Sequence, residues 1–411
     1  MAPLPLDFVR GHFPGLDQEG WALFDNAGGS LALEGVAAAA AEHLRHAAVQ
    51  LGASYALSRR ASERVAAGVA AVARLAGARP REVVVGPSTT QLLQNLARAL
   101  GPRLAPGDEV VVTDCDHEAN RSPWARLAER GVVVREWRLD RASLALRLDD
   151  LEPLMSPRTR LVCFPHVSNL LGTLHPAADF ARFVRERGAL SCVDGVAYAP
   201  HRRLDVGALG VDFYAFSLYK VYGPHLGALY VRDGLWAGLD NVNHDFFGPD
   251  AVPYKLQPGG PNHELTSSLV AIEAYLLGLA AAVGAPPEAP AGERLALAFD
   301  AIAGHEEALS ARFLAGLARL PGARVWGEPG PARARRVPTF SLTFEGRRSP
   351  DVVARVDEAR VAVRHGDFYA PRLVERLGLG PQGGVVRASM VHYNTEAEVD
   401  RLLEALEAAT R

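Results

Sequence analysis

The chain has 411 residues, of which 48% are hydrophobic and 22% charged, a composition that excludes a disordered protein. Its 44 Lys and Arg residues nearly balance its 47 Asp and Glu residues, so nucleic acid and membrane surfaces are not expected as partners. Three cysteines without a C-x-x-C pair argue against a disulfide scaffold or zinc ribbon. Asp7 and Arg10 interrupt the N-terminal stretch, so we expect a cytoplasmic protein without a signal peptide. The apolar run Ala274–Pro287 is expected to be too short to cross a bilayer.

Up to about residue 231, short apolar runs alternate with segments of helical period. The predicted strands are Glu82–Val85, Glu109–Thr113, Val132–Trp137, Leu161–Pro165, Leu190–Val193, Phe213–Ser217 and Gly227–Val231. The predicted helices between them are Gln91–Leu100, Pro123–Glu129 and Ala177–Arg187. Strands that are apolar on successive residues and alternate with helices are typical of a mostly parallel sheet covered on both faces.

Proline, glycine and alanine cluster at residues 283–292 and predict a connection between two units. Beyond it we predict a helix over Glu293–Leu320, strands near Val325 and over Pro338–Phe344 and Val385–Val391, and a last helix over Glu396–Ala409. The pattern predicts a large α/β domain, residues 15–285. It also predicts a smaller α+β domain, residues 286–411 together with residues 1–14.

Two charged residues follow predicted strands. Asp194 ends one apolar strand, and Lys220 follows another. A lysine at the end of a buried strand loses hydration, which lowers the pKa of its amine and makes the amine nucleophilic. With a carboxylate opposite it, such a lysine suits a Schiff base to pyridoxal phosphate, whose pyridine nitrogen takes an acidic partner. The alternative is a surface lysine and a turn aspartate.

Hydroxyl groups lie where a phosphate would be held. Ser88, Thr89 and Thr90 follow a predicted strand and lead into the helix that begins at residue 91. Free N–H groups and hydroxyls at a helix N-terminus suit a cofactor phosphate, although these residues also suit an ordinary helix cap. Ser217, which ends a later strand, adds another hydroxyl.

Two further strands end near flat or amide side chains. His117 can stack its ring on a planar heterocycle, and Asn169 can donate a hydrogen bond to a ring oxygen. The chain has no P-loop, no G-x-G-x-x-G turn and no G-x-S-x-G elbow, which disfavours nucleotide-binding and α/β-hydrolase readings. No His, Cys or Asp pair has metal-ligand spacing on one helix, so no metal site is expected.

Together the motifs resemble the class V aminotransferase-fold family of pyridoxal phosphate enzymes. They are, in order, T-T at a helix start, D-H-x-A-N, S-N-x-x-G-T, V-D-G, S-x-x-K-x-x-G-P and R-A-S-x-x-x-Y-N-T. Within that family the chain most resembles the cysteine desulfurase and selenocysteine lyase branch, over residues 24–406. The resemblance implies fold type I, pyridoxal 5'-phosphate as the cofactor, a small amino acid as the substrate, and a homodimer with shared active sites.

The resemblance also assigns roles to residues. Lys220 is implied to carry the cofactor, Asp194 to pair with the pyridine nitrogen and His117 to stack on the ring. The further cofactor contacts that we expect are Asn169 at the ring oxygen and, around the phosphate, Ser88, Thr89, Thr90, Gln91, Ser217 and the backbone of Gly260. The substrate contacts that we expect are Arg387 for the carboxylate, Asn26 and Ala27 in the FDNAGGS turn, and Tyr369.

The chain also departs from the family pattern. Desulfurases carry a persulfide-forming cysteine on a loop that reads HGDFYAP here, and the aligned residue is Tyr369. Tyrosine cannot accept sulfur as a thiolate does. Tyr219 replaces a histidine before the lysine, and Gly259-Gly260 replaces a Gly-Thr pair that serves the neighbouring subunit. We therefore expect direct C–S or C–Se cleavage by β-elimination, without an enzyme persulfide. Aminotransferase or epimerase activity is the alternative, and a catalytically silent scaffold is the non-enzyme alternative.

Overall fold

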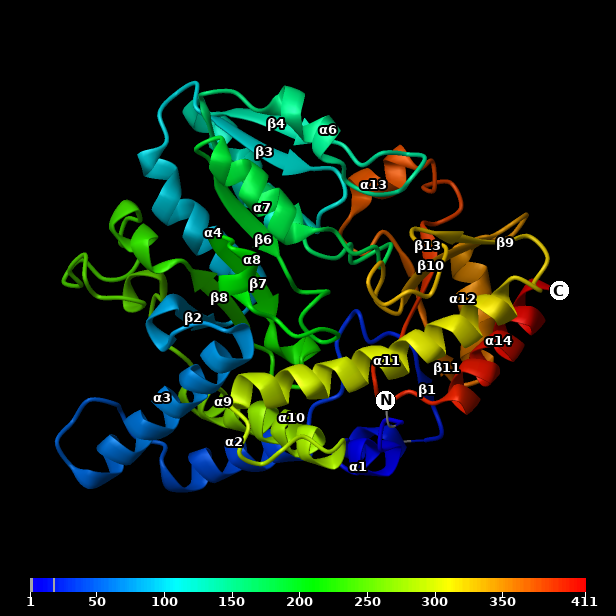
Figure 1. Cartoon of the computed structure of the whole chain (residues 1–411), viewed down its shortest axis with the longest axis horizontal. Coiled ribbons are helices and arrows are strands. Elements are labelled where there is room, and N and C mark those ends of the chain that lie inside the picture. The colour runs from blue at the N-terminus through cyan, green and yellow to red at the C-terminus, as the bar shows by residue number, and fades with distance from the viewer. Residues whose placement is uncertain (1–2, 18) are drawn as a thin grey trace.

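The computed structural model describes residues 3–17 and 19–411. Its large sheet has seven strands in the order β2-β8-β7-β6-β5-β3-β4 (Figure 1). These are β2 (Val83–Gly86), β3 (Glu109–Thr113), β4 (Val133–Trp137), β5 (Thr159–Pro165), β6 (Leu190–Asp194), β7 (Phe213–Ser217) and β8 (Gly227–Val231). Only β8 runs antiparallel to its neighbours within this described sheet. The predicted mostly parallel sheet is confirmed.

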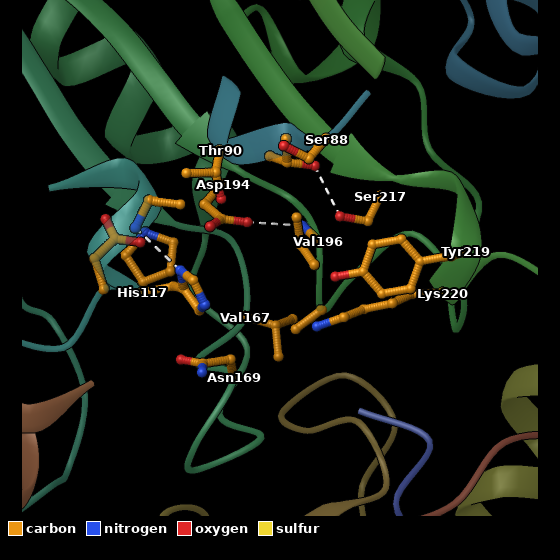
Figure 2. Close-up of a pocket in the computed structure, with 15 residues that line it drawn as sticks. Ser88, Thr90, His117, Val167, Asn169, Asp194, Val196, Ser217, Tyr219 and Lys220 are labelled. Carbon is orange, nitrogen blue, oxygen red and sulfur yellow. Dashed lines mark hydrogen bonds between the residues drawn. The ribbon is translucent and has the colours of Figure 1, made fainter. Parts of the chain in front are cut away.

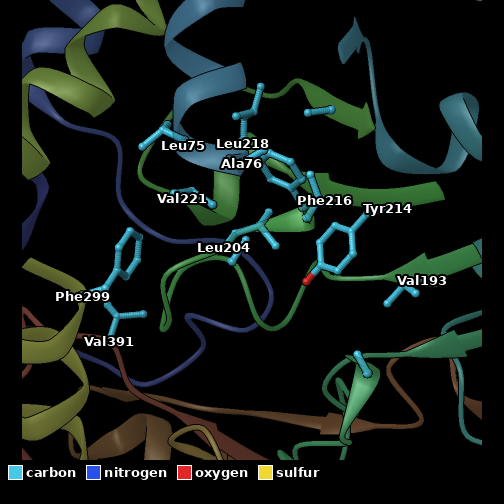
Figure 3. Packing of buried hydrophobic residues seen from close by; sticks show 14 of the residues in the cluster. Leu75, Ala76, Val193, Leu204, Tyr214, Phe216, Leu218, Val221, Phe299 and Val391 are labelled. Atoms are coloured by element: carbon cyan, nitrogen blue, oxygen red, sulfur yellow. The ribbon is translucent and has the colours of Figure 1, made fainter. Parts of the chain in front are cut away.

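Helices cover both faces of this sheet. They are α2 (Glu34–His46), α3 (Ala56–Ala76), α4 (Thr89–Leu100), α5 (Ser122–Ala125), α6 (Leu148–Leu151), α7 (Ala177–Glu186), α8 (Val206–Leu209), α9 (His263–Ser268) and α10 (Val270–Ala282). Within β3, Val111 belongs to the apolar core on one face of the sheet, which also includes residues of α3, α7 and α10, some of which Figure 3 shows. Val110 and Val112 belong to the core on the other face, together with residues of α4 and α5. Successive side chains of a strand point to opposite faces, and both faces here are apolar because both are covered.

The C-terminal part has its own sheet, in the order β12-β13-β10-β9. Its strands are β9 (Ala323–Trp326), β10 (Thr339–Phe344), β12 (Arg364–Gly366) and β13 (Val385–Ser389). A separate parallel pair joins β1 (Ala22–Leu23) to β11 (Val361–Ala362). The remaining helices are α1 (Leu6–Arg10), α11 (Ala291–Leu317), α12 (Ser349–Glu358), α13 (Pro371–Arg376) and α14 (Glu396–Thr410). The domain boundary at residues 285–286 stays a prediction.

Most predicted elements lie within two or three residues of the observed ones. The helix predicted at Pro123–Glu129 is wrong in type over its second half, because α5 ends at Ala125 and a 3₁₀ helix follows over Arg126–Arg130. That turn ends at Gly131, whose φ of 83° is readily adopted by glycine. The tightened end lets the chain enter β4 at once.

The segment His263–Ala282, covering α9 and α10, is long and apolar enough to cross a membrane by length and composition alone. It is longer than the apolar run recognised in the sequence, because it begins before the acidic residue Glu273. Of its most apolar window, 56% is buried inside the protein. Helix α10 packs against α2, α3 and α11, as core helices of globular proteins do.

Gly227 sets how closely α4 approaches the sheet. A Cβ built on Gly227 would lie 2.4 Å from the backbone nitrogen of Thr89, far inside van der Waals contact. We expect Gly227→Ala to push back the start of α4 and to lower the free energy of unfolding by about 1–3 kcal/mol. Urea unfolding measures this change. Gly238→Ala, whose Cβ would meet nothing within 4 Å, is the matched control, and equal effects of the two variants would contradict the prediction.

Candidate active site

Polar side chains from five strand ends converge on one pocket at the C-terminal edge of the large sheet (Figure 2). This is the edge where ligands gather in open α/β sheets. The predicted residues that line the pocket are Ser88, Thr89, Thr90, His117, Asn169, Asp194, Ser217 and Lys220. The prediction that these strands deliver their polar groups to one place is confirmed.

Hydroxyl groups form the upper part of this pocket in Figure 2. Thr89 Oγ1 and Ser217 Oγ lie 2.7 Å apart, which brings the start of α4 to the end of β7. Ser88 caps α4, and its Oγ accepts the backbone N–H of Gln91 at 3.1 Å. The Gln91 side chain is exposed and does not line the pocket. A direct contact of Gln91 with a phosphate therefore stays a prediction, and the backbone N–H of Gln91 is already used by the helix cap.

Lys220 and Asp194 are a buried pair of opposite charges. Only 8% of Lys220 and 6% of Asp194 are exposed. Burial, and after it the charge of Arg387, lower the pKa of Lys220 to about 8, although Asp194 opposes this shift. Burial raises the pKa of Asp194 to about 6, against the N–H of Val196, which donates to Oδ1 at 2.8 Å, and against the charge of Lys220. The site thus holds an amine that loses its proton easily next to an acid.

His117 lies against the same pocket as a neutral ring. Burial, helped by the charges of Lys220 and Arg387, lowers its pKa to about 4. Its Nδ1 accepts the backbone N–H of Ala119 at 3.0 Å, so the ring proton resides on Nε2. The Tyr369 ring lies 5.1 Å from the His117 ring between centroids, which limits how the His117 ring can turn.

A second, outer pocket adjoins the first and shares His117, Asn169, Tyr219 and Lys220 with it. Residues 364–369, Arg387 and the backbone turn at Ala27 complete the outer pocket. The inner pocket and this outer pocket therefore meet at Lys220.

Arg387 is the buried cation of the outer pocket. Its Nη2 donates to Asp25 Oδ1 at 3.1 Å and its Nη1 to the carbonyl of Asn169 at 3.1 Å. Its Nε has no partner among the described residues, and the Phe368 ring lies 3.8 Å from the guanidinium carbon. Burial lowers the pKa of Arg387 to about 10, so the group stays charged at neutral pH.

The loop that bears Tyr369 is fixed to the site by hydrogen bonds. Asn169 Nδ2 donates to the carbonyl of Phe368 at 2.7 Å, and the N–H of Glu118 donates to the carbonyl of Tyr369 at 2.9 Å. Phe368 and Tyr369 have φ values of 52° and 61°. Residues other than glycine adopt positive φ values of this kind at a cost of about 1–3 kcal/mol each. The surrounding contacts therefore hold this loop in place.

The Aminotransferase class-V family model matches residues 22–248 and 292–402. An aminotransferase-like protein, FGM3, of Gibberella zeae is 41% identical over 98% of both chains. A cysteine desulfurase-like protein, ustD, of Aspergillus flavus is 34% identical over 96% of this chain and 88% of its own. The apo structure of a cysteine desulfurase from Thermococcus onnurineus superposes with a TM-score of 0.88 at 27% identity, covering 100% of this chain and 99% of its own.

The chain belongs to the class V aminotransferase family. Members of this family are pyridoxal phosphate-dependent enzymes of fold type I, and this chain is one of the cysteine desulfurase-like members. Its cofactor is pyridoxal 5'-phosphate.

The residues present fit that cofactor. Asn169 Oδ1 is buried without a partner in the described chain, beside a pocket that also holds a lysine, an acid and a flat histidine ring. The 12-residue helix α4 points its N-terminus at the same space, which favours a phosphate there. The lysine, the ring partners and the anion site are thus present together in one pocket.

One predicted residue does not reach the site in this chain. The Asn26 side chain is buried, and its Nδ2 donates to the carbonyls of Leu23 and Ser389 at 3.1 and 3.0 Å. It holds the N-terminal segment against β13, while its neighbour Ala27 lines the outer pocket. The N–H of Gly260, expected to serve the phosphate of a neighbouring subunit, donates to the carbonyl of Gln257 at 3.0 Å within its own turn. The role of Gly260 stays a prediction.

The three cysteines are remote from any sulfur-accepting position. Cys115, Cys163 and Cys192 are completely buried, and burial raises the pKa values of Cys115 and Cys163 well above the usual range. Tyr369 stands at the mouth of the outer pocket and is 68% exposed. No described thiol faces either pocket.

Some residues of the pockets were not predicted. The inner pocket includes Asp116, Val167 and Val196, and the outer one includes Arg364. Asp116 carried a usable signal, since it directly precedes His117 in the D-H-x-A-N motif. The two valines are apolar residues in loops, a pattern that does not distinguish pocket walls from core.

The lowered pKa of Lys220 predicts how the amine reacts. The chain contains two lysines, Lys220 and Lys255, and the Lys255 Nζ donates to the carbonyls of Leu239 and Pro249. We expect cofactor-free protein to form a borohydride-trappable link with pyridoxal phosphate at Lys220 only. The rate should rise about tenfold per pH unit below a midpoint near pH 8 and then level off, since only the free amine attacks.

Peptide mass mapping after reduction measures the site, and the rate across pH measures the midpoint. The variant Lys255→Arg is the control and should label as the native chain does. Labelling at Lys255, or a rate still rising steeply near pH 10, would contradict the prediction.

Proposed function

We propose that the inner pocket holds pyridoxal phosphate with its aldehyde on Lys220 and its ring nitrogen at Asp194. His117 would lie against the ring, and the hydroxyls of Thr89 and Ser217 would join the N-terminus of α4 around the phosphate. Asn169 Nδ2 donates one hydrogen to the carbonyl of Phe368, and its second hydrogen would serve the ring oxygen. The convergence of these groups on one buried pocket supports the assignment. So does the opposite-charge pair at its centre, because a charged acid keeps the ring nitrogen protonated.

We infer that the outer pocket binds the amino acid, with its carboxylate at Arg387. A guanidinium takes a planar carboxylate in a bidentate geometry, and the Nε of Arg387 has no other partner in the described chain. Asp25, which occupies Nη2, also neutralises the exposed Arg364 at 3.4 Å. A substrate carboxylate therefore competes with Asp25 for one side of the guanidinium.

When bound, the cofactor withdraws electrons from the amino acid and weakens the bonds at Cα. The Lys220 amine, once free, is the base at the junction of the two pockets and takes the Cα proton. Its lowered pKa, about 8, keeps a useful fraction unprotonated near neutral pH. Asp194 holds its charge at the far side of the pocket, and the neutral His117 ring excludes water from one face.

We propose β-elimination at a C–S or C–Se bond as the reaction, without an enzyme persulfide. For cysteine, cysteine and water give pyruvate, ammonia and hydrogen sulfide. The observation that carries this proposal is the mouth of the outer pocket, where Tyr369 stands and no described cysteine is within reach. A phenol does not accept sulfane sulfur, so the sulfur is released into the solvent as sulfide.

The products of L-cysteine and L-selenocysteine test the reaction. We expect pyruvate and sulfide (or selenide) in equal amounts, with no alanine and no protein-bound sulfane sulfur. Lys220→Ala should lower the rate by at least about a thousandfold. Tyr369→Cys is the matched variant, since it restores a thiol at the mouth. Its thiolate should attack the sulfur of part of the substrate, giving protein-bound persulfide and an equal amount of alanine in place of pyruvate and sulfide.

Three outcomes would contradict the elimination. Alanine together with persulfide on the native protein would show classical desulfuration. A keto acid that retains the sulfur, formed only with a second keto acid present, would show the transamination suggested by the aminotransferase-like relative. Release of the D-enantiomer would show epimerisation.

We also propose that the enzyme is a homodimer. Large apolar side chains are exposed on α2, α3 and the 244–254 loop, namely Leu44, Tyr55, Leu57, Phe246 and Tyr254. A groove beside them is lined by residues of α3 together with Tyr254 and Pro261. Phe246 is 79% exposed and its ring stacks on that of His244, an arrangement that favours burial against a second copy.

Sedimentation equilibrium tests the dimer. We expect twice the chain mass of 44.0 kDa for the native protein and weakened association, by about tenfold or more, for Phe246→Asp. The control is Leu297→Asp, which removes an exposed leucine of α11 at 44% exposure and should leave the mass unchanged. A native monomer would contradict the proposal.

A further inference from the structure

Asp116 is a second buried acid in the cofactor pocket. It follows β3, directly precedes His117 and is 3% exposed. It lines the same pocket as Asp194 and Lys220. The mechanism above gives it no task, yet an unused carboxyl in a buried site is costly to keep charged.

The hydrogen bonds of Asp116 are unequal. Its Oδ2 accepts the Nδ2 of Asn120 at 2.9 Å, whereas its Oδ1 is buried and has no partner among the described residues. Asn120 Nδ2 also lies 3.5 Å from the carbonyl of Cys192, and Asn120 Oδ1 lies 3.5 Å from Cys192 Sγ. Since Cys192 is two residues before Asp194 in β6, one amide ties the two acid-bearing segments together. Oδ1 is the atom free to carry a proton.

The titratable groups around Asp116 offer it no direct cation. Asp194 faces it from β6, Cys163 from β5, and Cys115 from its own segment. Lys220 acts on Asp194 and on His117 rather than on Asp116. Burial first, and then the charge of Asp194, raise the pKa of Asp116 well above its usual range, against the hydrogen bond from Asn120.

We propose that Asp116 is a positioning residue that stays a neutral acid, so that the two carboxyl groups hold one negative charge and that charge resides on Asp194, at the ring nitrogen. The pair then behaves as coupled carboxyls that share a site, in which only one ionises. Loss of Asp194 would remove the repulsion, and Asp116 would take over part of the charge.

A purely structural role of Asp116 predicts different results for its ionisation and for cofactor binding. If Asp116 only anchored Asn120, its ionisation would not respond to Asp194, and the two residues would contribute independently to cofactor binding. The inference rests on the placement of the ring nitrogen proposed above. Its first test therefore uses no cofactor, so that failure of the cofactor placement and failure of the inference are distinguishable.

The first test is infrared spectroscopy of the cofactor-free full chain near pH 7. The spectrum of the native protein minus that of Asp116→Asn should show the carbonyl stretch of one protonated carboxyl, shifted in D₂O. Glu109→Gln is the matched control, because Arg135 holds the pKa of the buried Glu109 at about 2 and that residue should contribute only carboxylate bands. A carboxylate difference for Asp116→Asn would overturn the proposal.

The second test is a double-mutant cycle read by the dissociation constant of pyridoxal phosphate and by the ¹⁵N shift of its labelled ring nitrogen. Asp116→Asn alone should change the dissociation constant by less than about threefold, since an amide mimics a neutral acid. In the Asp194→Asn background the same change should weaken binding by a further tenfold or more, about one pKa unit of lost charge interaction. In that background it should also move the ¹⁵N shift toward the unprotonated value.

Additive effects in the cycle, or an Asp116→Asn effect as large as that of Asp194→Asn, would overturn the proposal. If a variant does not fold, ¹³C NMR of native protein with labelled aspartate carboxyls decides the question without mutation. One buried carboxyl should remain protonated above pH 7. If every aspartate carboxyl has ionised by that pH, the proposal fails.

Discussion

The burial of Lys220 with Asp194 is the interaction on which the rest of the site depends. Each group alone is costly to bury as a charge, and together they compensate only in part, so the pKa of the amine falls and that of the acid rises. A site of this kind needs a rigid frame, since relaxation of the protein or entry of water would return the pKa values of both groups to their ordinary range. The covered sheet edge provides that frame, with its strands packed on two faces.

The outer pocket follows a different principle, because its charges are balanced by side chains that the substrate can displace. Arg387 is satisfied by Asp25 and by a backbone carbonyl, while Phe368 covers its face. The bonds of Asn169 and Glu118 to the strained 366–369 loop fix that cover relative to the cofactor pocket. The two pockets thus share Asn169, whose backbone carbonyl accepts from Arg387 and whose side-chain amide donates to Phe368.

Much of this arrangement could be predicted from sequence, for physical reasons that differ between residues. Doubly covered strands are apolar throughout, so β3, β6 and β7 were readable, and the polar residues after them had to meet at one edge. Helix α2 reads EGVAAAAAEHLRH, and its run of alanines hides which face is buried, so α2 and α3 escaped prediction. Asn26 was misassigned because a local motif does not tell whether a polar side chain is already satisfied by backbone carbonyls.

The loop position that carries a cysteine in desulfurases lies apart from the groups that weaken the bonds at Cα. The bond-weakening groups lie on the strand ends of the large sheet, where Gly227 and the packing of α4 constrain them. Under the proposed reaction, the departing fragment would meet Tyr369 on the 366–369 loop, whose tip is exposed. A side chain at that tip can change without disturbing the buried charges, because Tyr369 contacts the inner site only through its backbone bonds and the edge of His117. The fate of the fragment can therefore diverge while the cofactor chemistry is retained.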